Sequence, residues 1–371
     1  MKTLAIITHT PHWVEDNTHY AYGPYVREMN LWIKQVDHTI VVAPKGDQDR
    51  SDIHWAYSKR IKHRIIPSVS LIGFRQKIRT CIYFPILVIA IFKTMRQADH
   101  IHLRCPGNIG LIGCLVQLCF PRKRKSAKYA GNWDPQSKQP WSYRLQQWIL
   151  RNTFLTRNMQ VLVYGEWANQ TANITPFFTA SYSQTQIPKQ QLKTEIKAPY
   201  RFLFVGSLVA GKRPEYAIDL IQNLKTQGLD VQLDFYGDGI LRETLEETVK
   251  LKELQDTIKF HGNQEAQVVQ EAYKYSHFLM LPSKSEGWPK VVAEAMFWNC
   301  VPLVCAVSCV PWMLNYGERG IVLSLETAID TKKISDLITD EASYVKMVET
   351  ASQWSQEYTL ETFEHAIQSI V

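Results

Sequence analysis

Several features that would classify this chain at once are missing from it. Its seven cysteines form no C-x-x-C pair and no histidine cluster accompanies them, so a zinc site is not indicated. We expect free, buried thiols in a reducing compartment. No apolar run reaches ~18 uninterrupted residues, so no transmembrane helix is expected. The first residues lead into the apolar stretch Leu4–Ile7 without an h-region or cleavage site, so no signal peptide is expected.

The composition is that of a folded, multidomain protein. At ~100–200 residues per domain, 371 residues suggest two domains, or three, each large enough to bury a core. The hydrophobic share of 45% excludes a disordered chain, and the 17 glycines and 17 prolines exclude a collagen-like one.

Charge is distributed unevenly along the chain. Residues 1–185 hold 24 Lys and Arg against 10 Asp and Glu, whereas residues 186–371 hold 18 against 25. The basic half suggests an anionic partner, such as a membrane surface, a phosphorylated substrate or a nucleic acid. No RNP, KH or zinc-finger pattern is present, so nucleic acid is not expected as a partner.

Short apolar runs alternate with longer amphipathic segments, which predicts an α/β fold with parallel sheets. Expected strands are Leu4–Ile7, Thr39–Ala43, His100–Leu103, Gln160–Val163, Phe202–Val205, Val231–Tyr236 and His277–Leu281. Expected helices are Tyr25–Val36, Arg144–Phe154, Pro214–Lys225 and Leu241–Lys252.

The alternation occurs twice, so we expect two doubly wound, Rossmann-like domains. The first covers residues 1–180 and the second residues 200–350. Residues 181–199 are polar and carry no clear periodicity, which is typical of a linker. Residues 351–371 are expected as a C-terminal helix that can pack back on the first domain.

The segment Ser283–Met296 is the most informative part of the sequence. It follows an apolar strand, and Pro289 suits the first turn of a helix because its missing N–H would be unpaired there anyway. Glu286 is then expected on a loop at the carboxyl end of a strand, and Glu294 about a turn and a half inside the helix. Ligands bind at that edge of open α/β sheets, and a helix N-terminus favours a phosphate.

This segment resembles glycosyltransferase family 4, the retaining nucleotide-sugar transferases of the two-domain GT-B fold. Glu286 and Glu294 match the E-x7-E motif of that family, and Met296–Val304 resembles its continuation. Phe204–Pro214 resembles the strand–loop–helix that binds the donor diphosphate, and two further landmarks, Tyr236–Gly239 and Phe260–Gly262, follow in the expected order.

The resemblance implies roles for individual residues in the second half. Glu294 corresponds to the carboxylate that holds the donor ribose, Glu286 to the one near the reacting carbon of the sugar, and Lys212 to the diphosphate lysine. Ser207 stands where the family usually has Arg, so Arg213 or Lys290 is expected to supply the missing charge. The predicted donor-binding residues are Gly206, Ser207, Lys212, Arg213, Gly287, Trp288, Lys290 and Glu294.

The amino-terminal half supplies the predicted acceptor side. Arg104 follows a strand and is expected to pair with an acceptor phosphate, and His12 is a second candidate acceptor contact. Gly23 lies where the family's glycine-rich loop approaches the donor. Asn132 and Asp134 stand where family members often carry a catalytic histidine; they are predicted to act on the acceptor, although Asp134-Pro135 is equally a plain turn signal.

Two basic segments of this half suggest an anionic membrane. Basic residues flank the apolar run Cys81–Phe92, and residues 122–125 read Arg-Lys-Arg-Lys. For the apolar run we favour a buried helix, Ile82–Met95, with cationic ends. Docking is therefore assigned to residues 122–125.

The expected function is retaining transfer of a sugar from a nucleotide sugar to a glycan or lipid-linked acceptor, with no cofactor or metal. The expected location is cytoplasmic, peripheral on the inner face of the plasma membrane. Two alternatives stay open: a nucleotide-sugar 2-epimerase of the same fold, and an inactive sugar-nucleotide-binding partner subunit.

Overall fold

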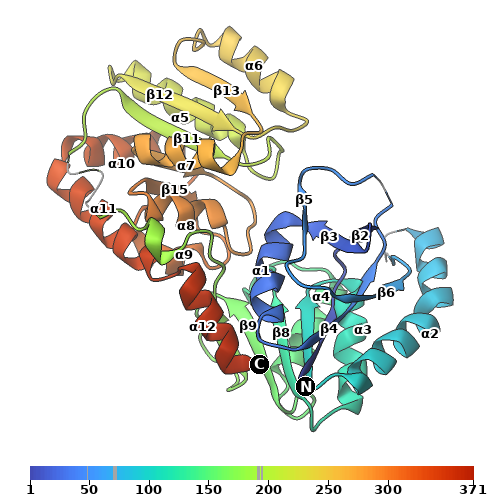
Figure 1. Cartoon of the computed structure of the whole chain (residues 1–371). Coiled ribbons are helices and arrows are strands. Elements are labelled where there is room, and N and C mark those ends of the chain that lie inside the picture. Colours follow the sequence, from blue (N-terminus) through green and yellow to red (C-terminus); the bar gives the residue numbers. More distant parts are fainter. Residues whose placement is uncertain (48, 70–72, 190–192, 194) are drawn as a thin grey trace. The chain divides into compact units, whose positions relative to one another are not determined.

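Two parallel sheets, of 7 and 6 strands, carry the fold (Figure 1). The computed structural model describes residues 1–47, 49–69, 73–189, 193 and 195–371. Unit 1 comprises Met1–Phe178 together with Phe363–Val371, and unit 2 comprises Thr179–Thr362.

The sheet of unit 1 has the strand order β10-β9-β8-β7-β1-β4-β6, with every pairing parallel. Its strands are β1 (Thr3–Ile7), β4 (His38–Pro44), β6 (Lys62–Ile66), β7 (His100–Cys105), β8 (Arg124–Tyr129), β9 (Met159–Tyr164) and β10 (Ile174–Phe177). The central strand β1 is fully buried from Leu4 to Ile7, which explains its unbroken apolar sequence.

The helices of unit 1 are α1 (Gly23–Ile33), α2 (Phe74–Gln97), α3 (Asn108–Val116) and α4 (Trp141–Arg151), with a 3-10 turn at Gln117–Cys119. A small antiparallel sheet of β2 (His12–Glu15), β3 (Thr18–Tyr22) and β5 (His54–Ala56) was not predicted. Asp16 and Asn17 join β2 to β3 with positive φ angles of 47° and 61°. Two such residues in succession are typical of a tight hairpin turn, a signal that the sequence did contain.

The sheet of unit 2 has the order β13-β12-β11-β14-β15-β16 and is also parallel. Its strands are β11 (Tyr200–Val205), β12 (Val231–Tyr236), β13 (Ile258–Gly262), β14 (Phe278–Leu281), β15 (Val301–Cys305) and β16 (Ile321–Leu323). Its helices are α5 (Pro214–Thr226), α6 (Arg242–Leu251), α7 (Ala266–Tyr275), α8 (Lys290–Phe297), α9 (Val310–Met313), α10 (Thr327–Thr339) and α11 (Glu341–Gln356), with 3-10 turns at Gln184–Gln186 and Asn315–Gly317.

The predicted α/β class with two parallel sheets is confirmed, and each predicted strand overlaps an observed one. The C-terminal stretch contains α11 and then α12 (Leu360–Ile370). The ring of Phe363 in α12 lies 5.2 Å from that of Phe177 and 5.6 Å from that of Phe178, all within unit 1. Residues 179–189, 193 and 195–199, which include most of the predicted linker, belong to unit 2.

Two predictions about the amino-terminal half are wrong, namely the buried helix over the apolar run and the burial of all its thiols. The apolar run is not a buried helix, because the side chains of Ile82 and Ile86 in α2 are exposed. By length and composition alone, the helix Ile78–Gln97 could cross a membrane, and the absence of a transmembrane helix stays a prediction. Cys81 and Cys119 are exposed, whereas the other five cysteines are buried.

The basic run 122–125 is also not a uniform solvated patch. Lys125 is only 2% exposed, and its ammonium donates to Oε1 of Gln117 at 2.8 Å. Lys123 donates to the carbonyl oxygens of Met95 (2.9 Å) and Arg96 (2.7 Å) at the end of α2. Only Arg122 and Arg124 of the four are exposed.

Candidate functional site

Two loops of unit 2 meet at the carboxyl edge of the neighbouring strands β11 and β14. The loop after β11 contains Gly211 and Lys212, and the loop after β14 contains Lys284 and Glu286. The backbone N–H of Lys284 donates to the carbonyl of Gly211 at 2.8 Å, which fixes one loop against the other. This edge is where ligands bind in open parallel sheets.

An ion pair joins the two loops. The ammonium of Lys212 contacts Oε1 of Glu286. The predicted diphosphate cation is therefore paired with the predicted sugar carboxylate. Both side chains are partly shielded from solvent, with 28% and 11% exposed, so water screens the pair incompletely. The structure therefore brings together these two residues, as the resemblance implied, and their roles stay predictions.

Arg213 and Pro214 begin the helix that follows Lys212. Arg213 has the left-handed backbone angles φ 49° and ψ 53° before α5, and its guanidinium donates to the carbonyl of Pro282 at 3.1 Å. Its side chain thus reaches the loop after β14. Ser207 is exposed on the same loop as Lys212, and its hydroxyl offers no positive charge.

Gly206 marks the point where two loops come close together. Its N–H donates to the carbonyl of Tyr236 at 2.9 Å, and a Cβ on Gly237 would lie 2.1 Å from the carbonyl oxygen of Gly206. Gly237 also has φ +132°, so a side chain there would be both crowded and strained. The close approach of these loops explains the glycines of the Tyr236–Gly239 landmark.

Glu294 lies in α8, as predicted, and its carboxylate is held by two hydroxyl groups. Ser181 donates to Oε1 at 2.5 Å, and Tyr273 of α7 donates to Oε2 at 3.2 Å. Tyr273 is completely buried, and burial together with the charge of Glu294 raises the pKa of its hydroxyl well above the usual value. The hydroxyl therefore stays protonated and remains a donor.

Hydrogen bonds and aromatic packing hold the segment between Glu286 and α8 in place. The carbonyl of Gly287 accepts from the hydroxyl of Ser308 at 3.2 Å and from the thiol of Cys309 at 3.1 Å. The Trp288 ring is buried and lies 5.9 to 6.3 Å from the rings of Tyr358, Trp354 and Trp312. Its side chain is part of the packing, so only its backbone is expected to face a ligand. Pro289 directly precedes α8, and Lys290 is its first residue.

In unit 1, Arg104 belongs to a buried charge cluster. Its guanidinium donates to Oε1 of Glu28 at 2.5 Å, and the ammonium of Lys128 lies 3.1 Å from the same oxygen. An acceptor phosphate would have to share Arg104 with Glu28. Arg104 and Lys128 lie near the carboxyl ends of β7 and β8, and together with Glu28 they leave a net positive charge there. The acceptor role of Arg104 stays a prediction.

His12 and Gly23 are enclosed in this structure. His12 is fully buried; its Nδ1–H donates to the carbonyl of Thr10 (2.9 Å), and Nε2 accepts from the hydroxyl of Tyr57 (2.7 Å). The N–H of Gly23 donates to the carbonyl of Ile53 at 2.8 Å, and a Cβ there would lie 2.7 Å from the Trp55 ring. Ligand contacts by either residue would require this cover to move.

Asn132 and Asp134 stabilise a turn. Oδ1 of Asn132 accepts from the N–H of Asp134 at 2.9 Å, and Oδ1 of Asp134 accepts from the N–H of Gln136 at 2.8 Å. The plain turn interpretation accounts for these contacts. A role toward the acceptor stays a prediction.

Sequence reasoning missed three residues of these clusters: Ser181, Tyr273 and Glu28. Ser181 and Tyr273 lie 113 and 21 residues from Glu294, so no local pattern connects them to it. Glu28 did have a signal, because it falls on the apolar face of α1 between Tyr25 and Trp32 at helical spacing.

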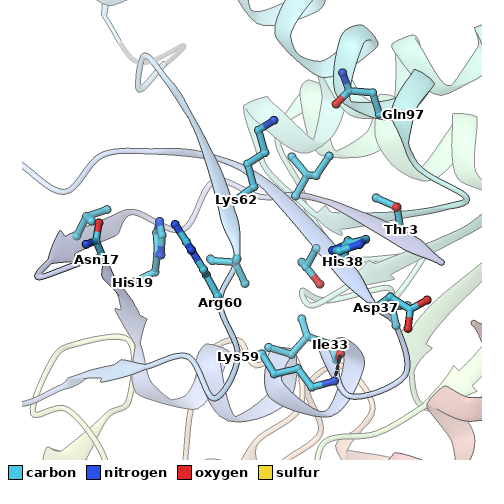
Figure 2. A pocket seen from close by; sticks show the side chains of 15 residues that line it. Thr3, Asn17, His19, Ile33, Asp37, His38, Lys59, Arg60, Lys62 and Gln97 are labelled. Atoms are coloured by element: carbon cyan, nitrogen blue, oxygen red, sulfur yellow. Dashed lines mark hydrogen bonds between the residues drawn. The ribbon is translucent and has the colours of Figure 1, made fainter. Parts of the chain in front are cut away.

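A cavity of about 910 Å³ lies elsewhere in unit 1 (Figure 2). Thr3, His38 and Lys62, the first residues of β1, β4 and β6, line it, so it lies at the amino-terminal edge of the sheet. The ammonium of Lys59 donates there to the carbonyl of Ile33 at 3.3 Å. None of the predicted site residues lines this cavity.

The part of the chain that holds the Lys212–Glu286 pair matches a known family. Residues 186–354 match the family described as Glycosyl transferases group 1. This match covers less than half of the chain, and over that part the chain is similar to the group 1 glycosyltransferases. An uncharacterized glycosyltransferase of Haemophilus influenzae is 29% identical over 182 residues, which are 48% of this chain and 50% of that protein.

A second curated relative is the alpha-D-kanosaminyltransferase of Streptomyces kanamyceticus, 26% identical over 151 residues, or 40% of this chain and 39% of the relative. The alignments thus span half or less of these relatives. Among solved structures, HepE of Anabaena in complex with UDP and glucose has a TM-score of 0.66 at 14% identity and covers 100% of this chain and 98% of that one. This likeness confirms the predicted GT-B fold.

Proposed function

We propose that this chain is a group 1 glycosyltransferase, which transfers a sugar from a nucleoside diphosphate sugar to a glycan or lipid-linked acceptor with retention of configuration. The observation that carries the proposal is the meeting of Lys212 and Glu286 on two loops at the carboxyl edge of β11 and β14. Complexes of HepE with UDP and glucose support a donor of this class.

The proposed chemistry needs positive charge beside the leaving group. The bond between the anomeric carbon and the diphosphate oxygen breaks, and the nucleoside diphosphate leaves with growing negative charge. Lys212 is the cation for that charge, and Arg213 lies next to it. The acceptor hydroxyl forms the new bond to the same carbon and loses its proton; Asn132 and Asp134 are predicted to assist it, through a hydrogen bond or as the base.

The carboxylates have complementary tasks in this scheme. Glu294 accepts hydrogen bonds from the hydroxyls of Ser181 and Tyr273. A carboxylate oriented in this way can also accept from a pair of ribose hydroxyls, because each oxygen has a second lone pair. Glu286 is the carboxylate for the sugar, and donor binding would redirect Lys212 from Glu286 toward the diphosphate.

A panel of nucleotide sugars tests the proposal. Release of nucleoside diphosphate is measured with a lipid-diphosphate-linked sugar, with the same sugar as a free oligosaccharide, and without an acceptor. Acceptor-dependent release with a new glycosidic linkage is expected. Conversion of the donor without an acceptor would indicate the 2-epimerase, and binding without turnover would indicate an inactive partner subunit.

Metal independence is a separate part of the proposal. Among the described residues, no group of three or more His, Cys, Asp or Glu side chains is arranged to hold a metal ion. The cations Lys212 and Arg213 would take the place of a metal at the diphosphate. Turnover is expected to be unchanged by EDTA; loss with EDTA and recovery with Mg²⁺ would contradict this part.

A further inference from the structure

The solvent-facing side of α2 is apolar. Ile78, Ile82, Ile86 and Ile89 follow one another at intervals of three or four residues, so they form one stripe along the helix. The side chains of Ile82, Ile86 and Ile89 are 65%, 53% and 52% exposed. Scattered exposed leucines and isoleucines are ordinary on protein surfaces, but a continuous stripe marks an interaction surface.

Positive charge is found at both ends of this stripe. Arg75 and Arg79 are exposed around its first residue, and Lys93 and Arg96 are exposed after its last. The sequence from 74 to 98 contains no Asp or Glu. Because Lys123 binds the last carbonyl oxygens of α2, the exposed Arg122 and Arg124 are neighbours of the same end.

The opposite side of α2 is anchored in unit 1. Leu87, Ile91 and Met95 are completely buried and belong to the same core as the strands of the sheet. The guanidinium of Arg64 donates to the carbonyl of Ala90 at 3.1 Å in the middle of the apolar segment. A helix that crossed a bilayer would have to leave this core and bring a charged partner with it, which is costly.

We propose that α2 lies parallel to the surface of an anionic lipid bilayer, with its isoleucine stripe in the interface and its terminal cations on the lipid headgroups. A helix with one apolar face and flanking cations binds membranes in this way. Figure 1 shows α2 running along the outside of unit 1, beside α3. The proposal rests on this surface alone and does not depend on sugar transfer.

A second copy of the chain is a less suitable occupant. In a two-fold symmetric contact through this face, each stripe would meet its own copy, and the cations at its ends would approach those of the partner. Repulsion between these cations opposes such a contact, whereas anionic headgroups attract the same cations.

The test is co-sedimentation of the full chain with vesicles of neutral phosphatidylcholine, with or without about 30% phosphatidylglycerol, at low and high salt. Stronger binding to the anionic vesicles is expected, with a decrease in high salt as screening increases. The triple variant Ile82→Ser, Ile86→Ser, Ile89→Ser is expected to bind at least ~10-fold more weakly. Single changes to Gln should each weaken binding about fivefold at Arg75, Arg79, Lys93 and Arg96.

A matched control changes three exposed isoleucines elsewhere, Ile53, Ile240 and Ile329, to Ser. This variant should bind like the wild type. In a Cys119→Ser background, an environment-sensitive fluorophore on the exposed Cys81 should shift to shorter wavelength with anionic vesicles. The fluorophore signal tests the same contact without altering the stripe.

Three results would overturn the proposal. The first is that wild-type protein does not bind anionic vesicles. The second is that the triple isoleucine variant binds them as well as the wild type. Sedimentation velocity could instead reveal a dimer that only the stripe variant dissociates, which would assign the face to a second copy.

Discussion

Lys212 and Glu286 form an ion pair although 74 residues separate them in the chain. Each belongs to a different loop, and the loops meet because β11 and β14 are neighbours in a parallel sheet. A donor diphosphate would compete with Glu286 for the ammonium. The pair therefore links the charge of the predicted donor site to the carboxylate that is predicted to face the sugar.

That competition separates binding from turnover. Lys212→Ala should lower kcat/KM strongly, because the leaving diphosphate loses its cation. Glu286→Gln should lower turnover without weakening the affinity for nucleoside diphosphate, since Lys212 no longer has a competing carboxylate. Steady-state kinetics and calorimetry measure the two effects. Lys332→Ala, an exposed cation of α10, is the control, and near-normal kcat/KM in Lys212→Ala would assign the diphosphate to another cation.

Glu294 is expected to determine donor affinity. Glu294→Ala removes a charged acceptor of hydrogen bonds and should weaken nucleotide binding by ~1.5–3 kcal/mol, roughly 10- to 100-fold. Calorimetry with the nucleoside diphosphate measures the effect, and Glu349→Ala on the exposed face of α11 is the control. Unchanged affinity with an intact fold would refute the ribose assignment.

Tyr273 is expected to act as a positioning residue for Glu294. Tyr273→Phe keeps the ring but removes the donor to Oε2, so donor affinity should fall about 3- to 10-fold, equivalent to one neutral-donor hydrogen bond. Tyr275→Phe, on the exposed side of the same helix, should have no effect. A fall in Tm without a change in affinity would show that the hydroxyl supports only the fold.

The burial of His12 predicts a loss of stability in acid. Burial lowers the pKa of His12 from 6.5 to about 3, so the ring stays neutral in the folded chain but is protonated below about pH 6.5 after unfolding. Its contribution is complete above that pH and declines as pH falls toward about 3. At pH 5 the loss is about 2 kcal/mol.

The measurement is the free energy of unfolding in urea between pH 7.5 and about pH 5. The unfolding free energy of His12→Gln at pH 7.5 can differ from that of the wild type. The comparison is of the pH dependence, which should be less steep in the variant. Parallel slopes for the two proteins would contradict a neutral, buried His12.

Much of the fold could be predicted because parallel strands leave a clear pattern. Strands buried on both faces are continuous apolar runs, and β1 and β14 are examples. The loop position of Glu286 and the helical position of Glu294 also followed from local sequence, since Pro289 marks the start of α8.

Burial of single side chains could not be predicted in the same way. Lys125 stands in a run of four basic residues, yet β8 carries it into the interior, where Gln117 and the carbonyl of Phe120 satisfy its ammonium. Apolar residues lie on nearly every side of α2. The spacing of its isoleucines therefore does not reveal which of them face solvent. Only the packing of Leu87, Ile91 and Met95 against the sheet decides it.

The amino-acid sequence by itself determined the parallel sheets, the order of their elements and the local setting of Glu286 and Glu294, because those depend on neighbours along the chain. The tertiary structure alone decided that Lys212 contacts Glu286, that Ser181 and Tyr273 hold Glu294, and that α2 exposes its isoleucines. These are contacts between segments distant in sequence, and their partners are chosen by strand order and by the core that each element covers.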